Sequence, residues 1–287
     1  MVTTTAKAGD LSVTALYTSA AWAWGGLSHA HLFASSDAKR VFDTTNAALA
    51  AARMSNRERA PLHQSLLHRH AMIDHLLHGS EYRHVIELAA GLSRRGAAAT
   101  SDPQVQYTEL DLPHVIGCKR ELLQRTDEGR AVLARPGLHL VVGDVETVAL
   151  EPFVGCDEPV FVIAEGLMMY LTADARRGLF AKVRQLAATT GELQFVFDLV
   201  PTDEEPQSDT AGRMLEAALK QCTGGRGFER DARTRYHIMT ALREAGFDAI
   251  ESVASSDVAH AWNLPEPDWR THVALFVARA SSPLNRE

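Results

Sequence analysis

Short apolar runs of β type alternate with helical patterns from residue 84 onward. The strand-like runs are Val85–Leu88, Val105–Leu110, Leu138–Val142, Val160–Ala164, Leu193–Leu199, Ala249–Val253 and Val273–Ala278. The helical patterns between most of them are Arg94–Thr100, Val115–Glu128, Ala173–Ala188 and Ala232–Ala245. This alternation predicts crossover connections and a largely parallel sheet in an α/β fold. The last two runs enclose Pro265 and Pro267 and leave little room for a crossover helix, so we expect the final strand to run antiparallel.

The stretch Glu87–Gly96, ELAAGLSRRG, predicts a turn that joins the first strand to an Ala-rich helix. Ligands of open α/β sheets bind at the carboxyl ends of the strands. The small residues Ala89 and Gly91 let the backbone approach a ligand, and glycine adopts a positive φ without steric cost. Asp111 ends the next strand, where an acid can accept both ribose hydroxyls of a nucleoside. A plain strand-turn-helix with a solvated Asp111 is the alternative.

Acidic residues stand in or beside the carboxyl ends of five strands. They are Glu87, Asp111, Asp144, Glu165 and Asp198. Each of them could instead cap a helix, a position that Asp favours after a strand. Asp144 could accept a hydrogen bond from an adenine amino group. Because the turn lacks GxGxxG, a pyrophosphate is disfavoured, and the carboxylates suit a cationic, zwitterionic nucleoside better.

Arg69 falls on the apolar stripe of a helix expected over residues 61–78. The stripe consists of Leu62, Leu66, Ile73 and Leu76. A guanidinium that points inward needs an anion, because an unpaired buried charge is costly. The anion is either a carboxylate of the protein or the carboxylate of a ligand held against the Glu87–Gly96 turn. The same helix is rich in histidine, but it has no HExxH pattern, and we expect no metal site.

Residues 11–60 look helical, with Trp22 and Trp24 just before Gly25 and Gly26. The two rings either pack in the core or form a lid that covers a bound substrate. We expect residues 1–80 to form a helical cap. Residues 81–287 would then form the Rossmann-like core, with a lid insertion at about 201–230.

Composition narrows the functional class of this chain of 287 residues. The formal charge is −7 and no long basic run occurs, which argues against a nucleic-acid surface. Three separated cysteines favour a reducing compartment. The first residues lack a signal-peptide core, and no apolar run is long enough to cross a bilayer. We therefore expect a cytoplasmic protein without a membrane partner.

The ordered motifs resemble the leucine carboxyl methyltransferase family, and most of all its bacterial branch, the polyketide-type O-methyltransferases. The motifs are ELAAGLSRRG, then EL-DLP with Lys119, then GDV, AEGLMMYL and FD, and they cover Arg69 to Asp198. The resemblance implies a seven-stranded class I methyltransferase fold with S-adenosylmethionine as cofactor and S-adenosylhomocysteine as product. It also implies that Arg69 pairs with the methionine carboxylate and that the turn from Glu87 through Ala89 to Gly91 lies beneath the methionine part.

Further residues are candidates for contact with the cofactor or the substrate. The resemblance gives the ribose to Asp111 and the adenine to Asp144 and Val145, and Leu112 is a further candidate for cofactor contact. Glu165 would lie near the amino group or the acceptor, and Glu165 and Tyr170 are the nearest candidates for a catalytic role. The candidates for substrate contact are Tyr17, Trp22, Trp24, Tyr170 and Asp198.

Three departures from the family pattern bear on the substrate. Ala89 replaces the first Gly of L-G-x-G, and Ser93-Arg94-Arg95 replaces D-T-R. A lysine found near the N-terminus of the protein-methylating members has no counterpart near Ser12–Tyr17. The last departure favours a small molecule over a protein C-terminus.

The ionisation state of the methyl acceptor at pH 7 decides which class of acceptor we expect. A carboxylate is ionised at pH 7 and needs no general base, whereas a phenol, with a pKa of about 10, benefits from one. No histidine directly follows a strand end. We therefore expect carboxyl O-methylation of a polyketide-like or other secondary metabolite first, and phenol or alcohol O-methylation second. A nicotinamide oxidoreductase and a non-catalytic nucleoside-binding protein are the rival readings.

Overall fold

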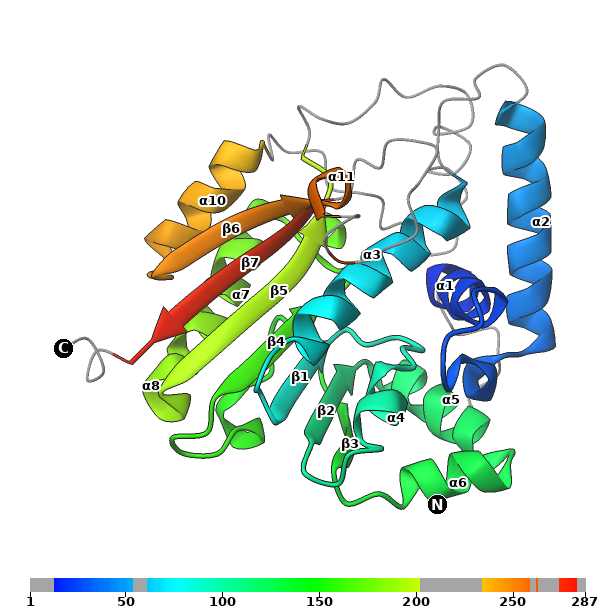
Figure 1. Ribbon diagram of the computed structural model, residues 1–287, viewed down its shortest axis with the longest axis horizontal. Coiled ribbons are helices and arrows are strands. Elements are labelled where there is room, and N and C mark those ends of the chain that lie inside the picture. The colour runs from blue at the N-terminus through cyan, green and yellow to red at the C-terminus, as the bar shows by residue number, and fades with distance from the viewer. Residues whose placement is uncertain (1–12, 54–60, 202–233, 259–261, 263–273, 283–287) are drawn as a thin grey trace.

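A seven-stranded sheet with the order β3-β2-β1-β4-β5-β7-β6 organises the computed structural model (Figure 1). The structure describes residues 13–53, 61–201, 234–258, 262 and 274–282. The strands are β1 (His84–Leu88), β2 (Gln106–Asp111), β3 (Leu138–Val142), β4 (Val160–Ala164), β5 (Glu192–Leu199), β6 (Ala249–Ala254) and β7 (Ala274–Ser281). All seven expected strands are therefore present, each within a few residues of its expected bounds.

The direction of the last strand is as expected. β1 pairs in parallel with β2 and β4, and β4 pairs in parallel with β5. β7 runs antiparallel to both β5 and β6, between which it lies. This agrees with the sequence of the connection after β6, where Pro265 and Pro267 disfavour the packed crossover helix that parallel strands usually have.

Helices cover both faces of the sheet and one of its ends. They are α1 (Val13–Trp24), η2 (Ala30–Phe33), α2 (Ser36–Arg53), α3 (Leu62–His78), α4 (Arg95–Ala99), α5 (Pro113–Gln124), α6 (Asp127–Leu133), η3 (Glu151–Phe153), η4 (Met168–Tyr170), α7 (Ala173–Gln185), α8 (Ala187–Thr190), α10 (Arg235–Glu244) and α11 (Ser255–Val258). α1 and α2 pack together beside α3 (Figure 1).

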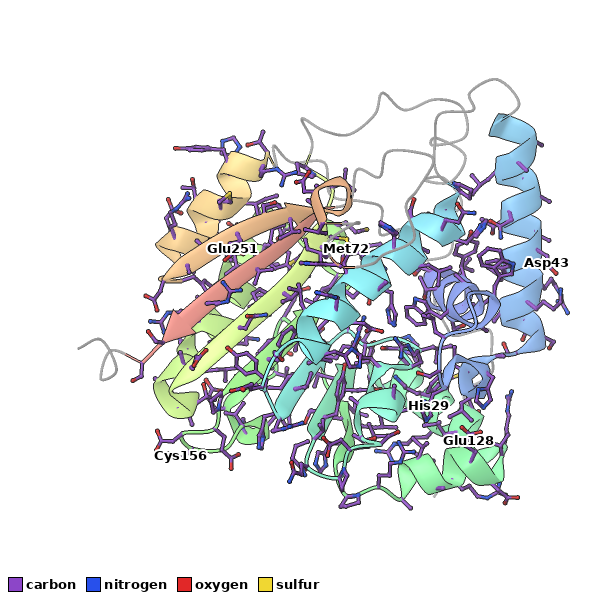
Figure 2. All side chains as sticks on the ribbon, in the orientation of Figure 1. His29, Asp43, Met72, Glu128, Cys156 and Glu251 are labelled. Carbon is purple, nitrogen blue, oxygen red and sulfur yellow. The ribbon has the colours of Figure 1, made fainter. Side chains whose placement is uncertain are left out.

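Alternation along the strands produces two apolar layers. On β1, Ile86 joins Phe180 of α7 and Leu242 of α10 in one core cluster. The neighbouring Val85 faces the other way and joins Met72 of α3 in a second cluster. Met72 lies where α3 meets the sheet, whereas Asp43 lies on the exposed side of α2 (Figure 2). α3, expected within the cap, therefore packs directly on the sheet.

Two expectations need comment. The single helix expected over Val115–Glu128 is two helices, α5 and α6, because Thr126 caps the second one by accepting a hydrogen bond from Gly129 N at 3.0 Å. The insertion expected at about 201–230 lies, apart from its first residue, outside the described residues.

Among the helices that the structure describes, none is long and apolar enough to span a membrane.

Candidate functional site at the carboxyl ends of the strands

The turn after β1 and the end of β2 are joined by a hydrogen bond. Gly91 N–H donates to Asp111 Oδ2 at 2.6 Å, and Leu112 N–H donates to Asp111 Oδ1 at 2.7 Å. Burial raises the pKa of the Asp111 carboxyl, while the two backbone donors oppose this shift. Each carboxylate oxygen keeps a second lone pair, so Asp111 can still accept hydrogen bonds from ribose hydroxyls.

The backbone of this turn visits the left-handed region twice. Gly91 has φ 54°, as its sequence position suggested, and Ala89 has φ 51°. A Cβ added at Gly91 would lie 3.9 Å from the Cβ of Ala15, so the first turn of α1 covers this place. Ala89, which stands where the family pattern has its first Gly, therefore has a backbone conformation that glycine adopts most easily.

Arg69 pairs with two carboxylates of the protein. Its Nε donates to Glu165 Oε1 at 3.0 Å and its Nη1 donates to Asp198 Oδ2 at 3.0 Å. The internal anion considered for Arg69 is thus present, at the ends of β4 and β5. Within the described part of the chain Nη2 makes no hydrogen bond or ion pair, so donors remain for a ligand carboxylate.

Asp198 is held from the backbone side as well, and Glu165 by further charged side chains. Gly166 N–H donates to the second oxygen of Asp198 at 2.5 Å, and Gly166 has φ 70°. A Cβ on Gly166 would lie 3.3 Å from Arg69 Nη2 and would crowd the guanidinium. Burial opposes ionisation of Glu165, but contacts with His70, Arg69 and Arg95 hold its pKa well below the usual range.

A second arginine, absent from the sequence-based site, ties α3 and α4 to the sheet. Arg95 donates to Asp74 at 2.7 Å, to Glu87 at 2.5 Å and to Glu165 at 2.8 Å. Tyr107 donates to the other oxygen of Glu87 at 2.8 Å. The oxygens of Glu87, a candidate for cofactor contact, are therefore engaged by Arg95 and Tyr107.

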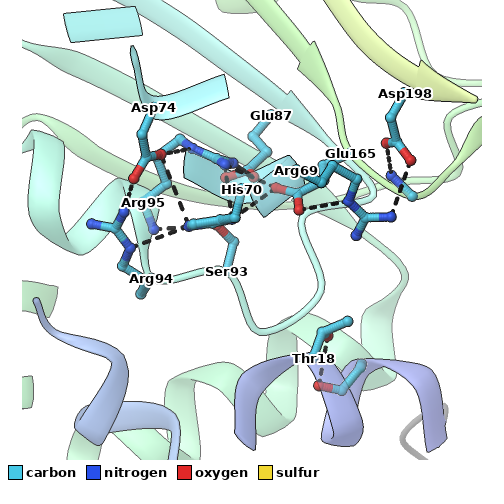
Figure 3. Close-up of polar contacts among 12 residues, drawn as sticks. Thr18, Arg69, His70, Asp74, Glu87, Ser93, Arg94, Arg95, Glu165 and Asp198 are labelled. Atoms are coloured by element: carbon cyan, nitrogen blue, oxygen red, sulfur yellow. Dashed lines mark hydrogen bonds and ion pairs between the residues drawn. The ribbon is translucent and has the colours of Figure 1, made fainter. Parts of the chain in front are cut away.

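These contacts merge into one buried charged cluster (Figure 3). Its members are three arginines and four acids, with a histidine among them: Arg69, Arg94, Arg95, Asp74, Glu87, Glu165, Asp198 and His70. Because the acids outnumber the arginines by one, the cluster carries a net negative charge when His70 is neutral. Sequence reasoning missed Arg94, Arg95, Asp74 and His70. The Ala-rich helix that begins at Arg95 was the available signal, since small residues let that helix approach the sheet closely.

The expected adenine residues lie beside this edge. Gly143 N–H donates to the carbonyl oxygen of Asp111 at 2.9 Å, which places the end of β3 next to the end of β2. Asp144 is exposed and accepts a hydrogen bond from Glu146 N at 2.9 Å. Val145 is buried and Leu112 is half-buried. Asp144 and Val145 thus follow a strand end that lies next to Asp111 and Leu112.

The aromatic candidates divide into two groups. Tyr17 donates to Asn46 at 2.7 Å, and Trp24, 57% exposed, stacks edge-on against His63. No recorded contact joins Tyr17 or Trp24 to the charged cluster in the part of the chain that the structure describes. Trp22, by contrast, lies against the His70 ring with centroids 4.6 Å apart.

Two aromatic side chains near the charged cluster bear on its chemistry. The buried indole N–H of Trp22 has no hydrogen-bond partner among the described residues. Burial raises the pKa of Tyr170, and a hydrogen bond with Thr14 of α1 partly opposes this shift. Tyr170 is therefore a neutral phenol at pH 7. No group of three or more His, Cys, Asp or Glu residues suited to a metal ion occurs among the residues searched, which are the described ones.

Comparison with known proteins gives a family and a fold. The family model described as Leucine carboxyl methyltransferase matches residues 28–184. A protein of Mycolicibacterium smegmatis named as an S-adenosyl-L-methionine-dependent methyltransferase is 40% identical over 109 residues, which are 37% of this chain and 36% of that protein. A similarly named protein of Mycobacterium avium is 32% identical over 111 residues, 39% of this chain and 36% of its own length. The chain thus matches only about a third of the length of these relatives.

Solved structures agree on the architecture. A methyltransferase structure from Thermobifida fusca YX superposes with a TM-score of 0.60 at 16% identity, over 96% of this chain and 97% of that chain. An O-methyltransferase family protein from Burkholderia thailandensis gives a TM-score of 0.52 at 14% identity, over 94% and 73%. At these identities the similarity establishes the fold alone.

Proposed function

Because the chain belongs to the leucine carboxyl methyltransferase family, we propose that it transfers the methyl group of S-adenosylmethionine to an oxygen of a small molecule. S-adenosylhomocysteine is the second product. The observation that carries the proposal is the hydrogen bond from Gly91 to Asp111. It joins a close-approach turn to a buried acid at the carboxyl ends of adjacent strands, where nucleosides bind in this fold class.

The chemistry of the charged cluster fits this cofactor. S-adenosylmethionine carries a carboxylate, an ammonium group and a sulfonium, and so has a net positive charge. Arg69 keeps donors for the carboxylate, while the excess of acids in the cluster favours the two cationic groups. Asp111 keeps acceptor capacity for the ribose. We assign Asp144, Val145 and Leu112 to the adenine side of the site.

The bound cofactor supplies the electrophilic methyl and the leaving group. The protein then has to hold the acceptor oxygen in line, and such positioning can lower a barrier by about 7–11 kcal/mol. Glu165 is ionised and engaged by Arg69, His70 and Arg95, so it suits electrostatic stabilisation better than proton transfer. Tyr170 is a neutral donor at pH 7. Neither group is a ready base, which favours an acceptor that is already ionised.

We therefore rank a carboxylic acid first as acceptor, with a methyl ester as product, and place a phenol or alcohol second. The absence of the lysine found near the N-terminus of protein-methylating members supports a small acid of the secondary-metabolite kind over a protein C-terminus. Trp22 and Tyr170 are the aromatic residues that we place beside the acceptor. We assign α1 and α2 to a cap, because Ala15 of α1 covers the Gly91 turn.

The decisive experiment incubates the protein with methyl-labelled S-adenosylmethionine and a panel of carboxylic acids and phenols. Mild alkali releases labelled methanol from a methyl ester but leaves an aryl ether intact, so the product identifies the acceptor class. Label that never leaves the cofactor, despite binding, would favour a non-catalytic nucleoside-binding protein. Stabilisation by NAD and none by S-adenosylhomocysteine in a melting assay would overturn the proposal in favour of an oxidoreductase.

A further inference from the structure

We infer that His70 is a positioning residue: it holds the carboxylate of Glu165, and through Glu165 the guanidinium of Arg69, in the orientation that receives the amino-acid end of the cofactor. This inference rests on the proposed function. His70 is fully buried on α3, next to Arg69 in the chain, and its Nδ1 lies 2.9 Å from Glu165 Oε2. Figure 3 shows the imidazole between Arg94 and Glu165.

The hydrogen-bond partners of the ring define its tautomer. Arg94 Nε is a donor only and lies 3.2 Å from His70 Nε2, so Nε2 must accept. The ring proton then resides on Nδ1 and points to Glu165 Oε2. Arg95 Nη2 lies 2.9 Å from the same Nδ1, but it also lies 2.8 Å from Glu165 Oε2 and donates there. His70 thus reads as a neutral imidazole that donates from one side and accepts on the other.

Protonation of His70 is disfavoured on several sides. Burial and the neighbouring Arg95 together lower its pKa to about 4, and the contact with Glu165 opposes this shift only in part. Trp22 closes one face of the ring, with centroids 4.6 Å apart. A neutral donor suits this place, because a fourth cation beside three guanidinium groups would compete for the same acids.

The consequence for Arg69 follows from the way in which Glu165 is shared. Oε1 accepts from Arg69 Nε, while Oε2 accepts from His70 and Arg95. Rotation of the carboxylate is therefore restrained at both oxygens. Without the Nδ1 donor one restraint on Oε2 is lost, and the plane of the carboxylate that aligns Arg69 is less well fixed. His70 also carries the contact from Trp22 of the cap to the cluster.

Three substitutions separate the two sides of the ring. In His70→Asn the amide nitrogen reaches the place of Nδ1 and keeps the donor to Glu165. In His70→Gln the amide reaches the place of Nε2 and keeps only the contact with Arg94. His70→Phe keeps the ring against Trp22 and loses both polar contacts. A matched control is His75→Asn on the same helix, whose exposed ring stacks on Trp262 with centroids 4.5 Å apart.

The test measures the affinity of each variant for S-adenosylhomocysteine by titration calorimetry, together with the urea midpoint without ligand. We expect His70→Asn and the control to bind within about threefold of the unmodified protein. His70→Gln and His70→Phe should bind about tenfold or more weakly, the loss typical of one hydrogen bond to a charged group. In turnover the KM for S-adenosylmethionine should rise more than kcat falls.

Equal affinity in all three variants would overturn the role of His70, and so would losses that follow the urea midpoints without rescue by Asn. If the unmodified protein itself does not bind S-adenosylhomocysteine, the proposed function fails, and this inference fails with it. Binding by the unmodified protein with unchanged variants overturns only the inference. The two failures are thus distinguishable.

Discussion

Arg69 on α3 and Asp198 at the end of β5 form a buried ion pair of 3.0 Å, although 129 positions separate them in the sequence. Glu165 adds a second ion pair to the same guanidinium. A buried charge of this kind is stable only with its partners in place. The two ion pairs therefore hold Arg69 within the fold, and its ligand role stays a proposal that rests on the donors left on Nη2.

Arg69→Met should destabilise the ligand-free protein by about 3–5 kcal/mol, because it strands the buried carboxylates of Glu165 and Asp198. Urea unfolding measures this loss. Arg177→Met is the matched control: its ion pair with Asp174 is exposed, and such pairs contribute about 0–1 kcal/mol. If the two variants lose equal stability, the buried pairs of Arg69 do not stabilise the fold. Where Arg69→Met still folds, its affinity for S-adenosylhomocysteine should fall sharply.

Gly96→Ala should destabilise the protein by about 1–3 kcal/mol through overpacking. A Cβ at Gly96 would overlap Glu109 Oε1 and would lie 2.9 Å from Leu138 Cδ1. Glu109 cannot easily move away, because it is buried against Lys119. The control is Gly178→Ala on the exposed side of α7, where a Cβ meets nothing within 4 Å. That change should stabilise by roughly 0.5–1 kcal/mol, and calorimetric melting should show shifts of opposite sign.

Ala89→Gly should leave stability unchanged or raise it by up to about 1 kcal/mol. Ala89 has φ 51°, and the left-handed conformation costs an ordinary residue roughly 1–2 kcal/mol, which exceeds the added entropy of glycine. Ala90→Gly is the control, because Ala90 is not among the residues with positive φ. It should lose up to about 1 kcal/mol. Equal losses of unfolding free energy in the two variants, measured by chemical denaturation, would contradict strain at Ala89.

Asp111→Ala should weaken binding of S-adenosylhomocysteine by about 1.5–3 kcal/mol, the typical value of a hydrogen bond to a charged group. It should also lower stability, since Gly91 N–H and Leu112 N–H lose their acceptor. Asp102→Ala is a matched control: Asp102 is half-buried and likewise accepts a backbone hydrogen bond, from the N–H of Gln104 at 2.9 Å. Unchanged affinity in calorimetry would restrict Asp111 to holding the turn.

The burial of His70 should appear in the pH dependence of stability. Its pKa falls from 6.5 to about 4 on folding, so between these values the unfolded chain binds more protons and stability decreases as pH falls. This pKa difference contributes about 3 kcal/mol to the free energy of unfolding. The contribution is fully present above pH 6.5 and is lost as the pH approaches 4. The groups that face the ring are Trp22, Arg94, Arg95, Glu165 and Asp74.

The comparison of the unmodified protein with His70→Phe isolates this effect. Burial raises the pKa of Glu109 to about 7, which gives a pH dependence of opposite sign over an overlapping range. Only the difference between the two urea curves, measured from pH 4 to 7, therefore reports on His70. A difference that does not change with pH would mean that the imidazole titrates alike in the folded and unfolded chain.

The fold was largely predictable because strand and helix periods are local properties of the sequence. The bounds of β3 and β4 match the expected runs, and the short Pro-containing connection correctly indicated the direction of β7. The Val115–Glu128 prediction missed the break at Arg125 and Thr126, where Thr126 starts a new helix. That capping hydrogen bond depends on a backbone conformation, which the spacing of apolar residues does not encode.

The site was less predictable. The apolar stripe correctly placed Arg69 inward, but its partners Glu165 and Asp198 are distant in the chain, and only the sheet brings them to α3. His70 was one of several histidines on that helix, and nothing local distinguishes the buried ring from the exposed His75. The roles of these residues toward a cofactor stay predictions.

The position of β7 between β5 and β6 has a consequence for synthesis. β6 is made before β7, yet among the strands of the described residues β7 is the one that pairs with β6. A nascent chain that has not yet reached Ala274 therefore has an open β5 edge, and β6 lacks this partner. Such an edge is a template for pairing with other chains. Closure of the sheet has to await the emergence of β7 from the ribosome, so this half of the core is completed after translation of that strand.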